Sequence, residues 1–298
     1  MKFAFDDDQL AFRDAVRDLL EKECSAAALR DAWTNETGRV PGLWDQLVEM
    51  GVVAMLVPET QGGLGMTMVD LILILEETGR YAVPEPIVET ATALPSFDRA
   101  DVTISGAHRF AAWADTADIV FTADGVFEQA TAELTPHPSV DGARRLFTVA
   151  GPAQPMPPTA GEAYARLTCG VAAQLCGLSD RMLEMTADYV KERKQFGVPV
   201  GSFQAVKHHL ANARVALEFA RPLVYRAAAT LEPVHTSMAF AKASDTAAMT
   251  AKAALQCHGA IGYTTEYDLH LYMKRAWALM RSFGDARFHR NRVAEAIL

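Results

Sequence analysis

Positive charge is scarce in this sequence of 298 residues. The chain has 28 Lys and Arg against 37 Asp and Glu, which gives a formal net charge of -9. A protein that binds nucleic acid must neutralise many phosphates. This charge balance therefore excludes nucleic acid as a main partner.

Cysteine is also rare, and long hydrophobic runs are missing. The four cysteines form no CxxC pair and lack the spacing of a zinc site: Cys24, Cys169, Cys176 and Cys257. We expect reduced thiols and no metal site. The longest apolar run, 69–75, is interrupted by Asp70 and falls far short of the roughly 20 residues that span a bilayer. With no signal-peptide core either, we expect a cytoplasmic protein without a membrane segment.

The first hundred residues have helical periodicity. Asp6 and Gln9 form a capping-box pattern ahead of an apolar helical face. A second helix is predicted over 42–50. The stretch 69–80 is apolar on nearly all sides, which predicts a helix buried among other helices, with Gly79 as its C-cap.

Between residues 97 and 158 the pattern becomes that of short strands. The predicted strands, separated by turn residues, cover 101–104, 108–114, 119–123 and 145–151. A proline-rich linker then leads to position 161.

The rest of the chain is helical in pattern. Apolar residues step by three and four from Phe203 to Val224, as in a helix-bundle seam. Further helices are predicted over 233–256 and 268–283. The predicted fold is mainly α, with an N-terminal helical domain over 1–96, a reduced β-region over 97–158 and a C-terminal four-helix bundle over 159–298.

Two stretches carry recognisable motifs. Residues 192–211 read ERKQFGVPVGSFQAVKHHLA, and residues 254–276 read ALQCHGAIGYTTEYDLHLYMKRA. They resemble the R-x-x-F-G…F-Q and Q-x-x-G-G-x-G motifs of the acyl-CoA dehydrogenase family, with Ala260 in place of the second glycine. The segments LWDQLVEMGVVAMLVPETQGGLG and EETGRYAVPEP resemble the N-terminal helical domain of that family.

In that family the two motifs bind FAD across a subunit interface. The resemblance implies that Arg193 meets the pyrophosphate and that Gln204 contacts the FAD of the neighbouring chain. A guanidinium suits phosphate, and Gly259 has no Cβ where a phosphate must come close. The predicted FAD-binding residues are Arg193, Phe196, Gln204, Gln256, Cys257, His258, Gly259 and Ala260.

The resemblance stops at the catalytic base. The family desaturates an acyl-CoA thioester: a glutamate removes the α-proton while the flavin takes the β-hydride. At the two positions where family members carry that base, this sequence has Phe283 and Leu167. Two family segments near the flavin ring are also missing from the β-region. We therefore predict no catalytic residue in this chain.

Three hypotheses remain open. The leading one is that the chain is similar to the shortened subunit of the α2β2 acyl-CoA dehydrogenases that act on steroid CoA esters. Its partners would be a larger subunit, which supplies the glutamate, and an acyl-CoA substrate. The second is a scaffold that binds no flavin. The third is a self-sufficient homotetramer that uses Glu162 or Asp285 as the base.

Overall fold

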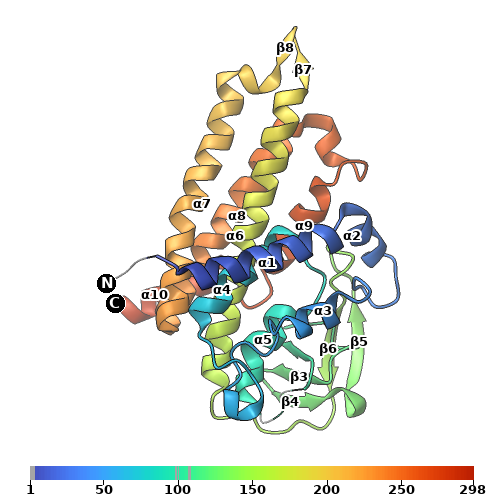
Figure 1. The fold of residues 1–298 in the computed structure, drawn as a ribbon, viewed down its shortest axis with the longest axis vertical. Helices are drawn as coiled ribbons and strands as arrows, with labels where there is room; N and C mark the ends of the chain where they lie inside the picture. The colour runs from blue at the N-terminus through green and yellow to red at the C-terminus, as the bar shows by residue number, and fades with distance from the viewer. Residues whose placement is uncertain (1–3, 98, 100, 107–108) are drawn as a thin grey trace.

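The computed structural model describes residues 4–97, 99, 101–106 and 109–298. An N-terminal group of helices and a small β-region lie at one end of a bundle of long helices, and a hairpin forms the opposite tip (Figure 1). The predicted mainly α fold is confirmed. The boundaries at 96/97 and 158/159 stay predictions.

The N-terminal helices begin with the predicted cap. The Asp6 carboxylate accepts a hydrogen bond from the Gln9 amide, and the Gln9 side chain accepts one from the Asp6 amide. The elements of this part are α1 (Asp7–Glu23), α2 (Ala26–Ala32), α3 (Leu43–Glu49), η1 (Glu59–Gln61), α4 (Met68–Arg80), α5 (Ile87–Ala93) and η2 (Leu94–Ser96).

Helix α4 is buried on nearly all sides, as predicted, but the prediction for its end was wrong. Gly79 is not the C-cap: it lies inside the helix, and Tyr81 caps it. The glycine has a packing role instead. A Cβ on Gly79 would lie 2.2 Å from the Gln174 carbonyl oxygen, and one on Gly177 would lie 1.9 Å from the Glu76 carbonyl oxygen. Glycine at these two positions lets the backbones of α4 and α6 (Ala160–Glu192) approach closely.

The β-region contains two small sheets, with strand orders β1-β3-β4 and β2-β6-β5. The predicted strands over 119–123 and 145–151 are β3 and β6. The run over 101–104 reaches only the first residue of β1, and the run over 108–114 begins at His108, outside the described residues. Strands β4 and β5 were not predicted. The strands are β1 (Ile104–Gly106), β2 (Ala111–Ala112), β3 (Ile119–Thr122), β4 (Gly125–Glu128), β5 (Glu133–His137) and β6 (Leu146–Ala150), with η3 (Gln129–Thr131) between β4 and β5.

The long helices pack as a bundle in which α8 contacts α6, α7 and α10. The predicted seam on α7 is buried from Ala213 to Val224, whereas Phe203, just before the helix, is 39% exposed. The predicted helix over 268–283 ends earlier, and α10 was not predicted. Beside α6, the helices are α7 (Gln204–Thr230), α8 (Pro233–His258), α9 (Leu269–Leu279) and α10 (Ala286–Ile297).

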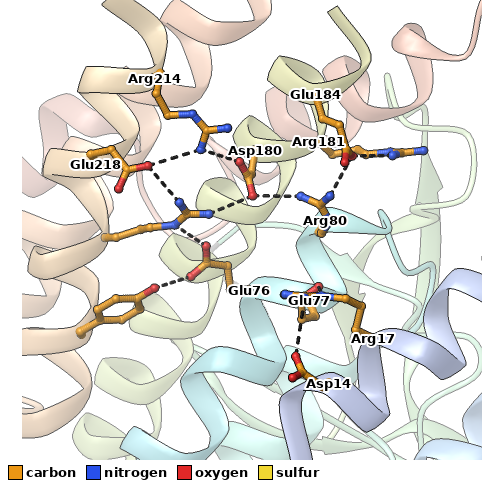
Figure 2. Close-up of polar contacts among 12 residues, drawn as sticks. Asp14, Arg17, Glu76, Glu77, Arg80, Asp180, Arg181, Glu184, Arg214 and Glu218 are labelled. Atoms are coloured by element: carbon orange, nitrogen blue, oxygen red, sulfur yellow. Dashed lines mark hydrogen bonds and ion pairs between the residues drawn. The ribbon is translucent and has the colours of Figure 1, made fainter. Parts of the chain in front are cut away.

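A network of ion pairs joins α4, α6 and α7 (Figure 2). Asp180 of α6 accepts hydrogen bonds from Arg80 (2.9 Å), Arg214 (2.7 Å) and Arg221 (3.0 Å). Arg221 also donates to Glu76 over 2.7 Å, and the Tyr225 hydroxyl donates to the other Glu76 oxygen over 2.9 Å.

The three arginines lower the pKa of Asp180, although its burial acts in the opposite direction. The network therefore holds charged side chains between the N-terminal helices and the bundle.

Candidate functional site: the open end of the bundle

The first FAD-type motif lies where α6 ends. Arg193 caps this helix in an extended conformation. The chain then forms a hairpin from β7 (Lys194–Gln195) and β8 (Val198–Pro199). The two turn residues, Phe196 and Gly197, have positive φ angles of 52° and 81°, as a two-residue hairpin with primed turn geometry requires.

The hairpin exposes Phe196 and returns the chain to the bundle. Phe196 is 94% exposed at the tip, with its ring centroid 6.2 Å from that of Phe203. The Val200 amide, in η4 (Val200–Ser202), donates to the Arg193 carbonyl over 2.8 Å. Gln204 then begins α7. The first motif, over 193–204, therefore lies at one end of the bundle, which we call its open end.

The polar side chains of this motif remain available. Arg193 and Gln204 are exposed. Within residues 4–97, 99, 101–106 and 109–298, neither side chain has a hydrogen bond or an ion pair. A guanidinium without a carboxylate partner can offer its paired N–H groups to a phosphate.

The second motif forms the turn at the end of α8. Gly259 caps the helix with φ 64° and begins η5 (Gly259–Tyr263). A Cβ on Gly259 would meet nothing within 4 Å, so the space beside it is open, and the positive φ explains why glycine is needed there. Gln256, Gly259 and Ala260 are exposed, and Cys257 is half-buried.

His258 differs from its neighbours because it is buried, with 4% of its surface exposed. Its Nδ1 lies 2.8 Å from the Ala254 carbonyl and donates to it, which leaves Nε2 as an acceptor. No partner for Nε2 is present in the described part of the chain. Burial lowers the pKa of His258, so the ring is neutral near pH 7.

Sequence reasoning missed Tyr189, which connects the two motifs. Its ring stacks on His258 at 4.4 Å between centroids, and its hydroxyl donates to the His258 carbonyl over 3.3 Å. Tyr267 closes the cluster, with its ring centroid 4.8 Å from that of His258. The available signal was spacing, because Tyr189 precedes Arg193 by four residues and shares its helical face.

The two base positions hold buried apolar side chains. Leu167 on α6 has no exposed surface, and Phe283 is 1% exposed. The Phe283 carbonyl accepts a hydrogen bond from the Tyr164 hydroxyl (2.7 Å), and its oxygen lies 3.0 Å from His289 Nε2. These contacts fix the segment after α9 with its phenylalanine inside the core.

Both alternative carboxylates already have local partners. Glu162 forms an ion pair with Arg166 one helical turn away. Asp285 is the N-cap of α10 and accepts a hydrogen bond from the Phe288 amide over 2.8 Å. That hydrogen bond lowers the pKa of Asp285, opposite to the raised pKa that a general base working near neutral pH needs.

Among the described residues, no group of three or more His, Cys, Asp or Glu is arranged to hold a metal ion. No described helix combines the length and apolar character needed to cross a membrane.

Comparisons with known proteins agree on one family. The acyl-CoA dehydrogenase N-terminal domain matches residues 6–96, and the acyl-CoA dehydrogenase C-terminal domain matches residues 163–298. The chain is 36% identical over 295 residues to acyl-CoA dehydrogenase IpdE2 of Mycolicibacterium smegmatis, covering 92% of this chain and 94% of that protein. The chain belongs to the acyl-CoA dehydrogenase family. Members of this family are FAD-dependent flavoproteins.

A further relative and two solved structures are also similar to this chain. IpdE2 of Mycobacterium tuberculosis is 33% identical, with 89% of each chain covered. Two solved structures share the acyl-CoA dehydrogenase fold. The ChsE4-ChsE5 complex from Mycobacterium tuberculosis has a TM-score of 0.88 at 18% identity, covering 100% of this chain and 99% of that one. The Tcur3481-Tcur3483 steroid ACAD variant has a TM-score of 0.87 at 21% identity, with 97% of each chain covered.

Proposed function

We propose that this chain is the shortened subunit of a heteromeric FAD-dependent acyl-CoA dehydrogenase, in which a larger subunit supplies the catalytic glutamate. One contrast carries the proposal. Arg193, Gln204 and Gln256 are exposed at one end of the bundle, whereas both base positions, Leu167 and Phe283, are filled by buried apolar side chains.

The residues at this end of the bundle suit the nucleotide part of an FAD molecule that is bound at a subunit interface. Arg193 would pair with the pyrophosphate through its N–H groups. The open space beside Gly259 allows a phosphate or ribose to approach the backbone. Gln204 and Gln256 would donate and accept hydrogen bonds around the nucleotide. The FAD-binding set of Arg193, Phe196, Gln204, Gln256, Cys257, His258, Gly259 and Ala260 therefore remains our assignment.

Bound FAD would supply the hydride acceptor for α,β-desaturation of an acyl-CoA. This chain would contribute binding and orientation. Tyr189 and His258 hold the turn over 256–260 against the end of α6, so that the two nucleotide-binding segments keep a fixed relation. The proton would be removed by a glutamate of the larger subunit.

Exposed apolar side chains on α7 and α8 support assembly with another subunit. Val215 and Phe219, on one face of α7, are 53% and 68% exposed. Met249 of α8 is 48% exposed and lies three residues beyond Thr246, whose hydroxyl donates to the Ala216 carbonyl of α7. Large exposed apolar side chains on these two packed helices would be covered at a protein interface.

We infer the substrate class from the names of the similar proteins. One similar solved structure is the ChsE4-ChsE5 complex and the other is a steroid ACAD, so we propose an α2β2 heterotetramer acting on a steroid-derived CoA ester. The described cysteines are free thiols, which suits a cytoplasmic location.

The test is co-expression with a longer relative that carries the glutamate. The measurements are particle mass, the flavin absorbance per complex and desaturation of the acyl-CoA. Arg193→Ala should lower flavin content, whereas Arg287→Ala, which removes an exposed arginine of α10, should not. Unchanged flavin content in Arg193→Ala would favour the scaffold hypothesis.

The self-sufficient enzyme is tested on the chain purified alone. If that chain holds stoichiometric FAD and desaturates an acyl-CoA, the division of labour is refuted. Glu162→Gln and Asp285→Asn then identify the base, because only loss of the true base would abolish turnover while flavin remains bound.

A further inference from the structure

The segment that follows the turn over 256–260 is bound to the N-terminal part of the chain. A loop over 264–268 joins η5 to α9, and the guanidinium of Arg30 on α2 donates three hydrogen bonds to it. Nε and Nη2 of Arg30 contact Asp268 Oδ1 over 3.2 and 2.6 Å, and Nη1 contacts the Thr265 carbonyl oxygen over 2.8 Å. One side chain of α2 therefore fixes this loop at two points.

Trp33, which caps α2, contacts the start of α9, and α2 lies beside α9 (Figure 1). The Trp33 and His270 rings meet edge to face, with centroids 5.3 Å apart, and the Lys274 ammonium lies 5.0 Å from the Trp33 centroid. His270 is 5% exposed, and its Nδ1 donates to the Tyr267 carbonyl over 2.9 Å. The end of α2 thus fixes the backbone of Tyr267 as well.

Tyr267 carries the contact from this loop to the turn at the end of α8. It lies between the two residues to which Arg30 donates, and its ring centroid is 4.8 Å from that of His258 and 5.7 Å from that of Tyr189. His258 directly precedes Gly259, whose positive φ shapes the turn. A continuous series of contacts therefore joins Arg30 to this turn.

Two properties of Arg30 separate a local positioning role from a general stabilising one. Its ion pair with Asp268 is half-exposed, with 38% and 39% of the two side chains accessible, and exposed pairs contribute little to global stability. Helix α2 has seven residues, of which two are buried, so it supplies a small share of the core. Loss of Arg30 should therefore loosen the loop over 264–268 locally and leave the fold intact.

We propose that Arg30 is a positioning residue for the FAD-binding turn, which gives the N-terminal part of the chain a role in flavin binding. Arg30 keeps Tyr267 against His258, so the turn over 256–260 is ordered before FAD arrives. Ordering a binding segment in advance reduces the loss of conformational entropy on binding. Arg30 acts through Tyr267 and is assigned no contact with FAD. The inference rests on the proposed function, because it requires that this turn binds FAD.

The experiment measures FAD affinity in the co-expressed complex, by titrating FAD into the flavin-free complex and following flavin fluorescence. Arg30→Met should raise the Kd for FAD by about three- to tenfold, the range expected when binding must order one more side chain. The melting temperature of the flavin-free complex should fall by less than about 3 °C. Arg30→Lys keeps the charge but loses the forked donors, so it should raise the Kd by a smaller factor.

Tyr267→Leu tests whether Arg30 acts through this ring. It should raise the Kd for FAD by a similar factor. Adding Arg30→Met to Tyr267→Leu should then change the Kd little further, because both substitutions remove the same contact with His258. Two independent structural effects would instead multiply, since their free energies add.

Arg99→Met is the matched control. It breaks an exposed ion pair with Glu128 of β4, whose side chains are 46% and 39% exposed, at the end of the molecule opposite to the hairpin of β7 and β8 (Figure 1). FAD affinity should stay at the wild-type value.

Three results would overturn the inference: a Kd in Arg30→Met that is no higher than in Arg99→Met, a melting temperature that falls in step with the affinity, or an effect that multiplies with that of Tyr267→Leu. A wild-type complex that takes up no FAD would refute the proposed function, and the inference with it. FAD bound to the wild-type complex makes the other results a test of Arg30 alone.

Discussion

The Tyr189 ring stacks on the His258 imidazole, with centroids 4.4 Å apart and planes inclined by 22°. This contact joins the last turn of α6 to the turn at the end of α8. The first prediction concerns the loss of this stacking contact. Tyr189→Ala should lower the flavin content of the co-expressed complex and destabilise the chain by about 1–3 kcal/mol through lost aromatic packing. Absorbance of bound flavin and urea unfolding measure the two effects.

Tyr189→Phe is the control for that prediction. It keeps the stacked ring and removes only the hydroxyl, which donates to the His258 carbonyl over a long 3.3 Å. Stability should change by less than about 1 kcal/mol, and flavin content should remain near wild type. Equal loss of flavin in both variants would show that the hydroxyl matters and that the stacking does not.

The second prediction concerns the crossing of α4 and α6. In Gly177→Ala the new methyl would lie 1.9 Å from the Glu76 carbonyl oxygen, a backbone atom that cannot move aside without shifting α4. We expect a loss of about 3 kcal/mol or more, because overpacking a rigid contact displaces backbone. Gly161→Ala, near the start of the same helix, meets nothing within 4 Å and should be neutral or stabilising by up to about 1 kcal/mol. Thermal unfolding of both variants separates the effect of packing at the α4–α6 crossing from that of helix propensity. Similar melting temperatures for the two variants would contradict the close approach of α4 and α6.

The third prediction concerns the ion pairs of Figure 2. Arg221→Met leaves Glu76, which is 7% exposed, without its charged partner. Breaking a buried pair in this way costs about 3–5 kcal/mol. Arg290→Met removes an arginine from an exposed pair with Asp245, and exposed pairs contribute about 0–1 kcal/mol. Denaturant midpoints that shift equally in the two variants would refute a structural role for the buried pair.

The fourth prediction concerns pH. Burial raises the pKa of Glu85 from 4.5 to about 7, despite the neighbouring Arg39. The folded chain therefore holds this proton more tightly than the unfolded chain does. Stability from Glu85 is present below pH 4.5 and is lost as the pH rises to about 7.

Glu85→Gln isolates this effect because glutamine does not titrate. The difference in unfolding free energy between variant and wild type should grow in favour of the variant from pH 4.5 to 7 and then level off. Urea unfolding across this range provides the measurement. A difference that stays constant with pH would mean that Glu85 has an ordinary pKa in the folded chain.

Several elements could be predicted from local pattern alone. The capping box at Asp6, the buried helix over 69–80 and the seam from Ala213 to Val224 each depend on residues close in sequence, so periodicity reveals them. The family motifs likewise selected the segments of the candidate FAD site, and contact of these segments with FAD stays a prediction.

Other elements depend on contacts between distant segments. Gly79 resembles a C-cap in the sequence, and only its approach to Gln174 explains it. Strand β5 is mostly exposed and contains Pro136, so it has neither an apolar alternation nor a strand-like composition. Tyr189 acts through His258, 69 positions further along the chain, a partner that helical periodicity does not identify.

The inward orientation of Phe283 limits which side chains this position can accept. Its side chain fills the core, and its carbonyl is hydrogen-bonded to Tyr164. A glutamate substituted there would introduce a carboxylate into an apolar site, where ionisation is strongly disfavoured. A single Phe283→Glu substitution would therefore destabilise the chain before it supplied a working base. Side chains that pack tightly around Phe283 raise this cost further, so a base at this position needs several neighbouring substitutions as well.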